Sequence, residues 1–308
     1  MAEAGATGLA RPDRTAQGIG LILASVAAMA LADATVKLVS ANLTLWQIFV
    51  TRSLVSAVVL TAVAFAIGPG LRARSPAWTL ARSALLVLSW IAFYASLPVL
   101  KLSVAAVAVY ANPIITALLS AMLIGEPVTR RQWAGVFLGF LGVVAILKPG
   151  TDAFSWYTIL PLAAGAFYSL AVILTRSKCR DEAPLTMALA LHVLFVATGL
   201  VATVALAVAG LDAAAVAASP FLLGSWAPMG LTEWGLMAFL GLLSAAYFAG
   251  VARAYQIAPP SVIATFDYAY LVSAAVWGFV FFAETPSLLT IGGMVLITIA
   301  GLLVASRR

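Results

Sequence analysis

Ten long apolar runs, separated by charged residues, prolines and glycines, take up most of this 308-residue chain. Each has roughly 17–26 residues, the length at which an α-helix crosses a ~30 Å hydrocarbon core. They lie near 18–39, 43–67, 82–98, 102–125, 132–148, 155–175, 184–209, 233–255, 260–283 and 288–305. The pattern predicts an all-α chain of ten membrane-spanning helices.

The composition supports an integral membrane protein. Hydrophobic residues make up 64% of the chain and charged residues only 9%, against about 25% charged residues in a soluble domain. The single cysteine, Cys179, excludes an internal disulfide and a cysteine-based metal site, and the single histidine, His192, disfavours a histidine-rich one. We therefore expect no metal and no cofactor.

The cationic residues are placed asymmetrically, which predicts the orientation of the chain. If the amino terminus is cytoplasmic, thirteen cationic residues fall inside, three fall outside and Arg52 lies within a span. The outer three are Lys37, Lys101 and Lys148, and the inner set includes Arg82 at the start of the third span. We expect a cytoplasmic tail over 1–17, both termini inside and contact with anionic lipid.

The plan of Tyr94–Gly150 recurs in Ala252–Arg308, about 158 residues later. The matched pairs are Ser103 and Ser261, Tyr110 and Tyr268, Glu126 and Glu284, and Gly135 and Gly293. Because five spans is an odd number, the second copy enters the membrane from the opposite side. The pattern predicts two inverted five-helix repeats, 18–150 and 151–308, around a central cavity. Chance similarity of two Ala/Leu-rich stretches is the alternative.

One stretch resembles a known family. Val-Ala-Ala-Val-Ala at 104–108 leads through Asn112-Pro113 to Gly125-Glu126, and Arg130-Arg131-Gln132-Trp133-Ala134-Gly135 follows with Gly139 and Gly142. Together with the duplicated five-span unit, this resembles the EamA-type drug/metabolite transporters and, among them, the YddG-like amino-acid exporters. In the second copy Leu271 replaces Pro113.

The resemblance implies export of small metabolites across a bacterial inner membrane, a basket of helices around a cavity, and no ATP site. The chain contains no G-x-x-x-x-G-K-[ST] run, so gradients would supply the energy. We expect a small-molecule substrate, no nucleic-acid partner and a monomer.

Ionisable residues within spans are candidate functional residues because they are costly in lipid. Asp33 and Lys37 share a helix face at i and i+4 and form either a gate or a self-neutralising pair near the outer interface. Arg52 and His192 occupy corresponding positions of the two repeats. Each is a gating or coupling candidate, with a purely structural role as the alternative.

Asp267 is the sharpest candidate for substrate binding, because no basic residue lies within four positions of it. An unpaired carboxylate in a membrane needs a remote partner, a proton or a wet cavity. Aromatic residues recur at mid-span and predict an amphipathic cavity, with ordinary packing as the alternative. The predicted cavity residues are Asp267, Tyr268, Tyr270, Tyr110, Asn112, Trp90, Tyr94, Tyr168, Tyr247 and Phe248.

Prolines indicate where spans bend. Asn112-Pro113 predicts a kink in the fourth span, which makes Pro113 a gating candidate. Pro259-Pro260 predicts the start of the ninth span, and Ala269-Tyr270 a bend within it. Glu126 is interpreted as a boundary residue that pairs with Arg130.

The sequence thus favours a secondary exporter, most of all for amino acids including aromatic ones. An exporter of organic cations from the same superfamily is the alternative, because aromatic faces and Asp267 also attract cations. A membrane enzyme is disfavoured, since Asp181-Glu182 is the only acidic cluster in the predicted cytoplasmic loops and no histidine lies near it. We expect no enzymatic activity.

Overall fold

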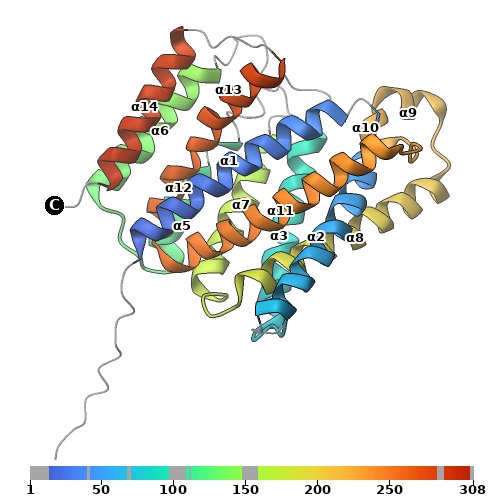
Figure 1. The fold of residues 1–308 in the computed structure, drawn as a ribbon. Coiled ribbons are helices and arrows are strands. Elements are labelled where there is room, and N and C mark those ends of the chain that lie inside the picture. The colour runs from blue at the N-terminus through green and yellow to red at the C-terminus, as the bar shows by residue number, and fades with distance from the viewer. Residues whose placement is uncertain are drawn as a thin grey trace, which may run out of the picture.

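The computed structural model describes residues 14–39, 42–67, 71–96, 109–110, 112–147, 159–282 and 288–305. All regular elements within these ranges are helices (Figure 1). The first half contains α1 (Thr15–Val39), α2 (Leu45–Ile67), α3 (Pro76–Ser96), α5 (Asn112–Leu123) and α6 (Arg130–Leu147). The second half contains α7 (Ile159–Ser177), α8 (Pro184–Ala209), α9 (Ala213–Ala218), α10 (Pro220–Leu223), α11 (Leu231–Ile257), α12 (Pro260–Asp267), α13 (Ala269–Phe282) and α14 (Leu288–Ala305).

Seven helical stretches within the described ranges are long and apolar enough to cross a membrane, with α12 and α13 counted as one. Two shorter apolar helical stretches, Asn112–Leu123 and Ile291–Leu303, lie where the fourth and tenth spans were predicted. The chain is a helical, multi-pass membrane protein. The number of ten spans stays a prediction, partly because 97–108 and 283–287 lie outside the described residues.

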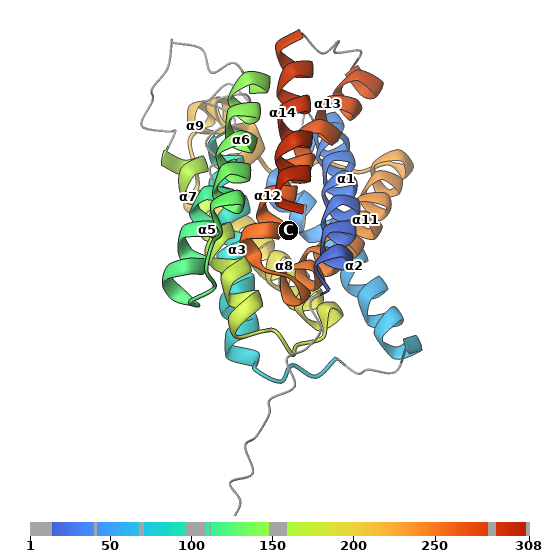
Figure 2. The same cartoon turned by 90° about the vertical axis from the view of Figure 1, so that its left-hand side faces the viewer.

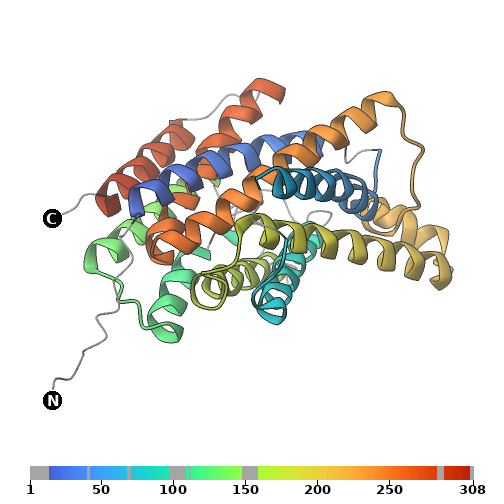
Figure 3. The ribbon, with the colours of Figure 1, turned by 60° about the horizontal axis from the view of Figure 1, so that its bottom comes forward.

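The helices pack in reciprocal pairs. α1 packs on α11 and α3 on α7, while α2 packs on α8, α5 on α12 and α6 on α14. Figure 1 shows α6 and α14 side by side, and Figure 2 shows α12 in the middle of the bundle, where it contacts α1, α5, α6, α7, α11 and α14. The short helices α9 and α10 lie on the far side of the bundle from α14 (Figures 1 and 3). This arrangement puts α12 beside any central cavity.

Local sequence accounts for several helix ends. α8 begins at Pro184, where proline is favourable because the first N–H groups of a helix have no intrahelical acceptor. It ends at Ala209, and the C-cap residue Gly210 has a φ of 56°, which glycine adopts without strain. α12 begins at Pro260 as predicted, and α13 follows after a single turn residue, Tyr268. The ninth span is therefore broken within one residue of the predicted bend.

Small residues allow close helix contacts, which matter where lipid gives little hydrophobic drive to association. A Cβ added to Gly142 of α6 would lie 2.7 Å from the carbonyl oxygen of Gly293 on α14. Between α2 and α11, the Ser56 hydroxyl lies 2.8 Å from both the Gly241 carbonyl oxygen and the Ser244 hydroxyl. Backbone proximity and short polar contacts hold these helices together.

The predicted start of the third span was wrong. α3 begins at Pro76 rather than near residue 82, so Arg82 is a buried helix residue and not a cytoplasmic flanking charge. Its Nε donates to Thr175 Oγ1 on α7 at 2.7 Å. Hydropathy alone predicts that a span begins after an arginine, because a charged residue is unfavourable in lipid. Arg82 can lie inside the bundle because Thr175 on a neighbouring helix accepts its hydrogen bond.

Candidate functional site

A cavity of about 340 Å³ lies among α1, α3, α5, α7, α12 and α13. Its lining is aromatic and acidic, with one asparagine, one serine and several aliphatic side chains. The lining residues are Met29, Asp33, Ser89, Trp90, Phe93, Val109, Tyr110, Asn112, Ala164, Tyr168, Asp267, Tyr270, Leu271 and Ala274. Small-molecule sites have this character, in which apolar walls carry a few polar groups that orient the ligand.

Asp267, the last residue of α12, is held by two tyrosines from other helices. Its Oδ2 accepts from the Tyr255 hydroxyl of α11 at 2.5 Å and from the Tyr168 hydroxyl of α7 at 3.3 Å. Its Oδ1 is buried and has no hydrogen-bond partner within the described residues. The two tyrosines therefore fix the carboxylate and leave one oxygen for a ligand.

The sequence prediction missed Tyr255. It lies near the end of α11 and does not line the cavity, but it is fully buried and makes the shortest contact with Asp267. The sequence signal that could have identified Tyr255 is that a tyrosine hydroxyl buried in a membrane span needs a hydrogen-bond partner. Nothing in the local sequence specifies that this partner lies twelve residues away on another helix.

Asp33 of α1 is a second carboxylate in the cavity wall. Its Oδ2 accepts from the Tyr270 hydroxyl of α13 at 2.7 Å, and its buried Oδ1 meets no partner in the part of the chain that the structure describes. The predicted partner, Lys37, has a side chain that lies outside the described residues, so the pair between them stays a prediction. In both acids, tyrosine hydroxyls donate to one carboxylate oxygen, and the described residues provide no partner for the other.

Six of the ten predicted cavity residues line this cavity: Trp90, Tyr110, Asn112, Tyr168, Asp267 and Tyr270. Tyr110 stacks on Tyr270 with ring centroids 5.5 Å apart and approaches Tyr268 at 6.3 Å. Tyr268 itself is buried against Gly139 of α6, outside the lining.

The other three predicted cavity residues form an aromatic layer behind Trp90. Tyr94 stacks on Trp90 at 5.3 Å, and Phe248 meets the same ring edge-to-face at 6.3 Å. Tyr247 lies 4.5 Å from Phe248 between ring centroids. These side chains support the cavity wall rather than face the cavity.

Arg52 and His192 are buried in the same layer. The Arg52 guanidinium lies 5.6 Å from the Phe49 ring, 6.0 Å from the Trp90 ring and 5.5 Å from the Phe195 ring. His192 packs edge-on against Phe248 at 5.5 Å. Among the described residues, Arg52 Nε and Nη2 and both His192 ring nitrogens lack hydrogen-bond partners. Three aromatic faces therefore stabilise the Arg52 cation.

Asn112 and Pro113 form the first turn of α5, and both are buried. Pro113 therefore removes no hydrogen bond from within α5, since the N–H groups of a first turn have no intrahelical acceptor. The predicted kink concerns the junction with residues up to 108, which lie outside the described residues. The role of Pro113 as a gate stays a prediction.

The predicted partner of Glu126 was wrong. Glu126 forms its ion pair with Arg176 of α7 at 2.7 Å, not with Arg130, and Arg176 also donates to the Gln256 carbonyl at 2.9 Å. Cys179, which lies just after α7, is fully buried. Burial raises the pKa of its thiol, which makes it a poor topology reporter. Packing between distant segments decides both outcomes.

The described residues contain no group of three or more His, Cys, Asp or Glu side chains placed to hold a metal ion. Asp33 and Asp267 each rely on tyrosine instead. The cavity lining offers two carboxylates and several aromatic faces.

Comparison with known proteins finds similarity to membrane transporters. The EamA-like transporter family matches residues 16–148. The pseudopaline exporter of Pseudomonas aeruginosa is 26% identical over 91% of this chain and 94% of its own length. The S-adenosylmethionine uptake transporter of Rickettsia felis is 24% identical over 93% of this chain and 92% of its own length. A riboflavin transporter of Rhizobium johnstonii is 28% identical over 67% of this chain and 61% of its own length.

The EamA-like match covers the first half of the chain, and the two matches over more than nine tenths of the chain are both to transporters. A crystal structure superposes on the chain with a TM-score of 0.73, covering 94% of this chain and 96% of the other at 17% identity. That likeness shows a shared fold over nearly the whole length. The relatives transport different metabolites, and the names include both an exporter and an uptake transporter.

Proposed function

We propose that the protein is a secondary transporter that exports small amphipathic metabolites bearing an amino group across the bacterial inner membrane. Amino acids, including aromatic ones, are the substrates we favour. One observation carries the proposal: Asp33 and Asp267 both line the cavity, and each presents a buried Oδ1 with no partner among the described residues. A substrate ammonium group supplies the donors that these oxygens lack.

The walls suit the rest of such a substrate. Trp90, Tyr110 and Tyr270 offer flat apolar surface to an aromatic or branched side chain. Asn112 adds an amide whose N–H groups can donate to a substrate carboxylate. No lysine or arginine lines the cavity within the described residues, which disfavours phosphorylated or strongly anionic ligands. A volume of about 340 Å³ falls within the range for small-molecule sites.

The same two carboxylates favour a second candidate, an exporter of organic cations. Aromatic rings beside an acid attract quaternary ammonium groups, and both Asp33 and Asp267 lie beside aromatic rings of the cavity wall. The two candidates differ in whether the substrate needs its own carboxylate. This difference makes them separable in a single assay.

Alternating access is the mechanism that we propose, supported by the reciprocal helix packing. In two inverted repeats, a contact between the first long helix of one half and the third long helix of the other should occur twice, once in each direction. The contact of α1 with α11 and the contact of α7 with α3 form such a pair. α2 and α8, the second long helix of each half, also pack on each other. The break at Tyr268 between α12 and α13 offers a hinge beside Asp267.

A polar contact at one end of the bundle fits a closed gate. Arg176, near the end of α7, joins Glu126 just after α5 to the Gln256 carbonyl near the end of α11. The distribution of cationic residues predicts that this end faces the cytoplasm. Release of Arg176 from either partner is the step that we expect to accompany opening on that side.

The test is counterflow in proteoliposomes with the purified full-length chain. Labelled phenylalanine, leucine and a quaternary ammonium dye are compared, together with the matching amines that lack a carboxylate. Amino-acid uptake that Asp33→Asn and Asp267→Asn both reduce supports the proposal. The control is Asp212→Asn, because Asp212 is an exposed acid that caps α9 far from the cavity. Transport of the dye and amines without amino acids would favour the cation exporter, and no transport of either would refute both.

A further inference from the structure

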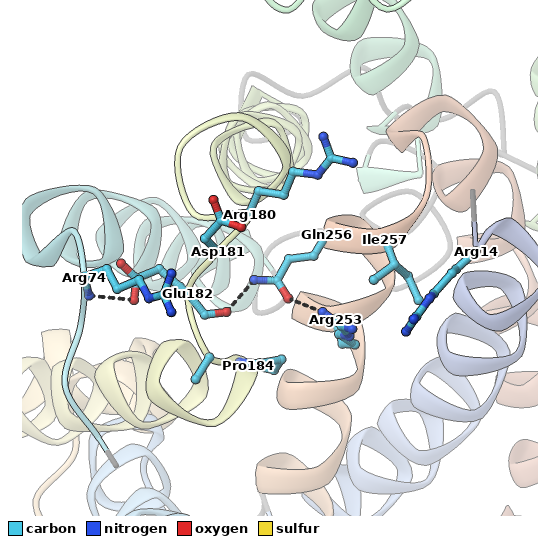
Figure 4. Close-up of a pocket in the computed structure, with 10 residues that line it drawn as sticks. Arg14, Arg74, Arg180, Asp181, Glu182, Pro184, Arg253, Gln256 and Ile257 are labelled. Atoms are coloured by element: carbon cyan, nitrogen blue, oxygen red, sulfur yellow. Dashed lines mark hydrogen bonds between the residues drawn. The ribbon is translucent and has the colours of Figure 1, made fainter. Parts of the chain in front are cut away.

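A second cavity, of about 460 Å³, lies at the end of the bundle where α1 begins and α11 ends. Arginines from four separate segments surround it, as Figure 4 shows: Arg14, Arg74, Arg180 and Arg253. Arg14 precedes α1, Arg74 lies between α2 and α3, Arg180 lies between α7 and α8, and Arg253 belongs to the last turns of α11. The two cavities have no lining residue in common. We call this second cavity the arginine pocket.

The floor of the arginine pocket is built by buried polar residues. The Glu182 carboxylate accepts from the backbone N–H groups of Arg74, at 3.0 Å, and Ser75. The Gln256 side chain donates to the carbonyl oxygens of Cys179 and Glu182 at 2.7 Å each. Both Glu182 and Gln256 are buried. These bonds fix the loops that carry Arg74 and Arg180, and they occupy the Glu182 carboxylate with backbone donors.

Charge in the pocket is unbalanced. Four arginines stand against two acids, Asp181 and Glu182. The Arg176–Glu126 ion pair lies outside this pocket, and the Glu182 carboxylate is engaged by backbone N–H groups rather than by a guanidinium group. Clustered arginines repel one another unless an anion lies between them, so the arrangement favours a bound anion.

The N-terminus of α8 adds to this potential. α8 has 26 residues and begins at Pro184, and its N-cap residue Ala183 provides no side-chain cap. Both residues line the arginine pocket. The positive end of a long helix dipole therefore lies at the same pocket as the arginines. Helix N-termini of this kind commonly bind phosphate.

We propose that the arginine pocket binds a phosphate group. Arginine suits this ligand because its planar fork donates two parallel hydrogen bonds to phosphate oxygens. An anionic lipid headgroup or a soluble phosphate supplies the same chemistry. The pocket lies at the ends of membrane helices on the predicted cytoplasmic side, where basic pockets between helices bind lipid phosphates. The bound group would tie together the segments before α1, α3 and α8 and the end of α11.

The test measures thermal unfolding of the purified full-length protein in detergent. Short-chain phosphatidylglycerol is titrated against phosphatidylcholine of the same chain length, and inorganic phosphate against chloride at equal ionic strength. The variants are Arg180→Gln and Arg253→Gln. Arg72→Gln is the matched control, since Arg72 is an exposed arginine of the same loop as Arg74 and does not line the pocket.

We expect phosphatidylglycerol to raise the unfolding temperature of the wild type and the control. Each pocket variant should need about tenfold more lipid for the same shift, the loss typical of one charge-assisted hydrogen bond. Stabilisation by inorganic phosphate with the same dependence on the variants would identify a soluble phosphate as the source. If neither phosphate compound stabilises the wild type, or if all variants respond alike, the proposal is refuted.

Discussion

Replacement of Asp267 by asparagine tests the substrate site most directly. The variant keeps the size of the side chain and retains one oxygen that can accept from Tyr255, which now lies 2.5 Å from Oδ2. It removes the negative charge and replaces one carboxylate oxygen with an NH₂ group. The open position at Oδ1, which accepts from the substrate in our proposal, would then repel an ammonium group.

The magnitude follows from the contacts. A hydrogen bond to a charged group contributes about 1.5–3 kcal/mol and a neutral one about 0.5–1.5 kcal/mol. The difference at a single site is about 1.4 kcal/mol, or tenfold in apparent affinity. We therefore expect transport of an amino-group substrate to fall at least about tenfold. The folded state should change little, because the Tyr255 contact survives.

The assay is counterflow of labelled phenylalanine in proteoliposomes, with thermal unfolding as the control for folding. Tyr255→Phe is the companion variant, since it removes one donor to Oδ2 but leaves the charge and Oδ1 in place. It should reduce transport less than Asp267→Asn does. Wild-type transport by Asp267→Asn from mildly acidic to mildly basic pH would refute the reasoning and make the carboxylate structural.

Three further predictions concern packing, topology and gating. Gly142→Ala should lower the free energy of unfolding by about 1–3 kcal/mol through overpacking against α14. Gly292→Ala, whose added Cβ would have open space around it, should change that free energy by less than about 0.5 kcal/mol. Equal shifts of the unfolding temperature in the two variants would contradict this prediction. Cys179 should label slowly and only from the cytoplasmic side, and faster as the pH rises, since burial raises the pKa of its thiol; Arg72→Cys in a chain lacking Cys179 should label readily, and also only from the cytoplasm. Glu126→Gln should lower the free energy of unfolding by under about 1 kcal/mol, because the Glu126–Arg176 ion pair is partly exposed. The same variant should lengthen the distance between spin labels on α5 and α11. An unchanged distance would argue against the gate.

Sequence reasoning placed the described helices well because the determinants of a span are local. Each backbone group in lipid bonds within its own helix, so run length and prolines define where α8 and α12 begin. The start of α3 was wrong because Arg82 is stabilised by Thr175 on another helix. The aromatic and acidic composition of the cavity was also predicted from residue types at mid-span, and six of the ten predicted residues line it.

The sequence by itself determined that the chain is a helical membrane protein, and it indicated which polar residues must find partners. Only the tertiary structure decided who the partners are. Asp33 meets Tyr270 across 237 residues of sequence, Asp267 meets Tyr168 across 99, and Glu126 takes Arg176 over the nearby Arg130. The reason is physical. Helix formation depends on neighbours within four residues, whereas side-chain pairing depends on the register and rotation of whole helices packed against one another.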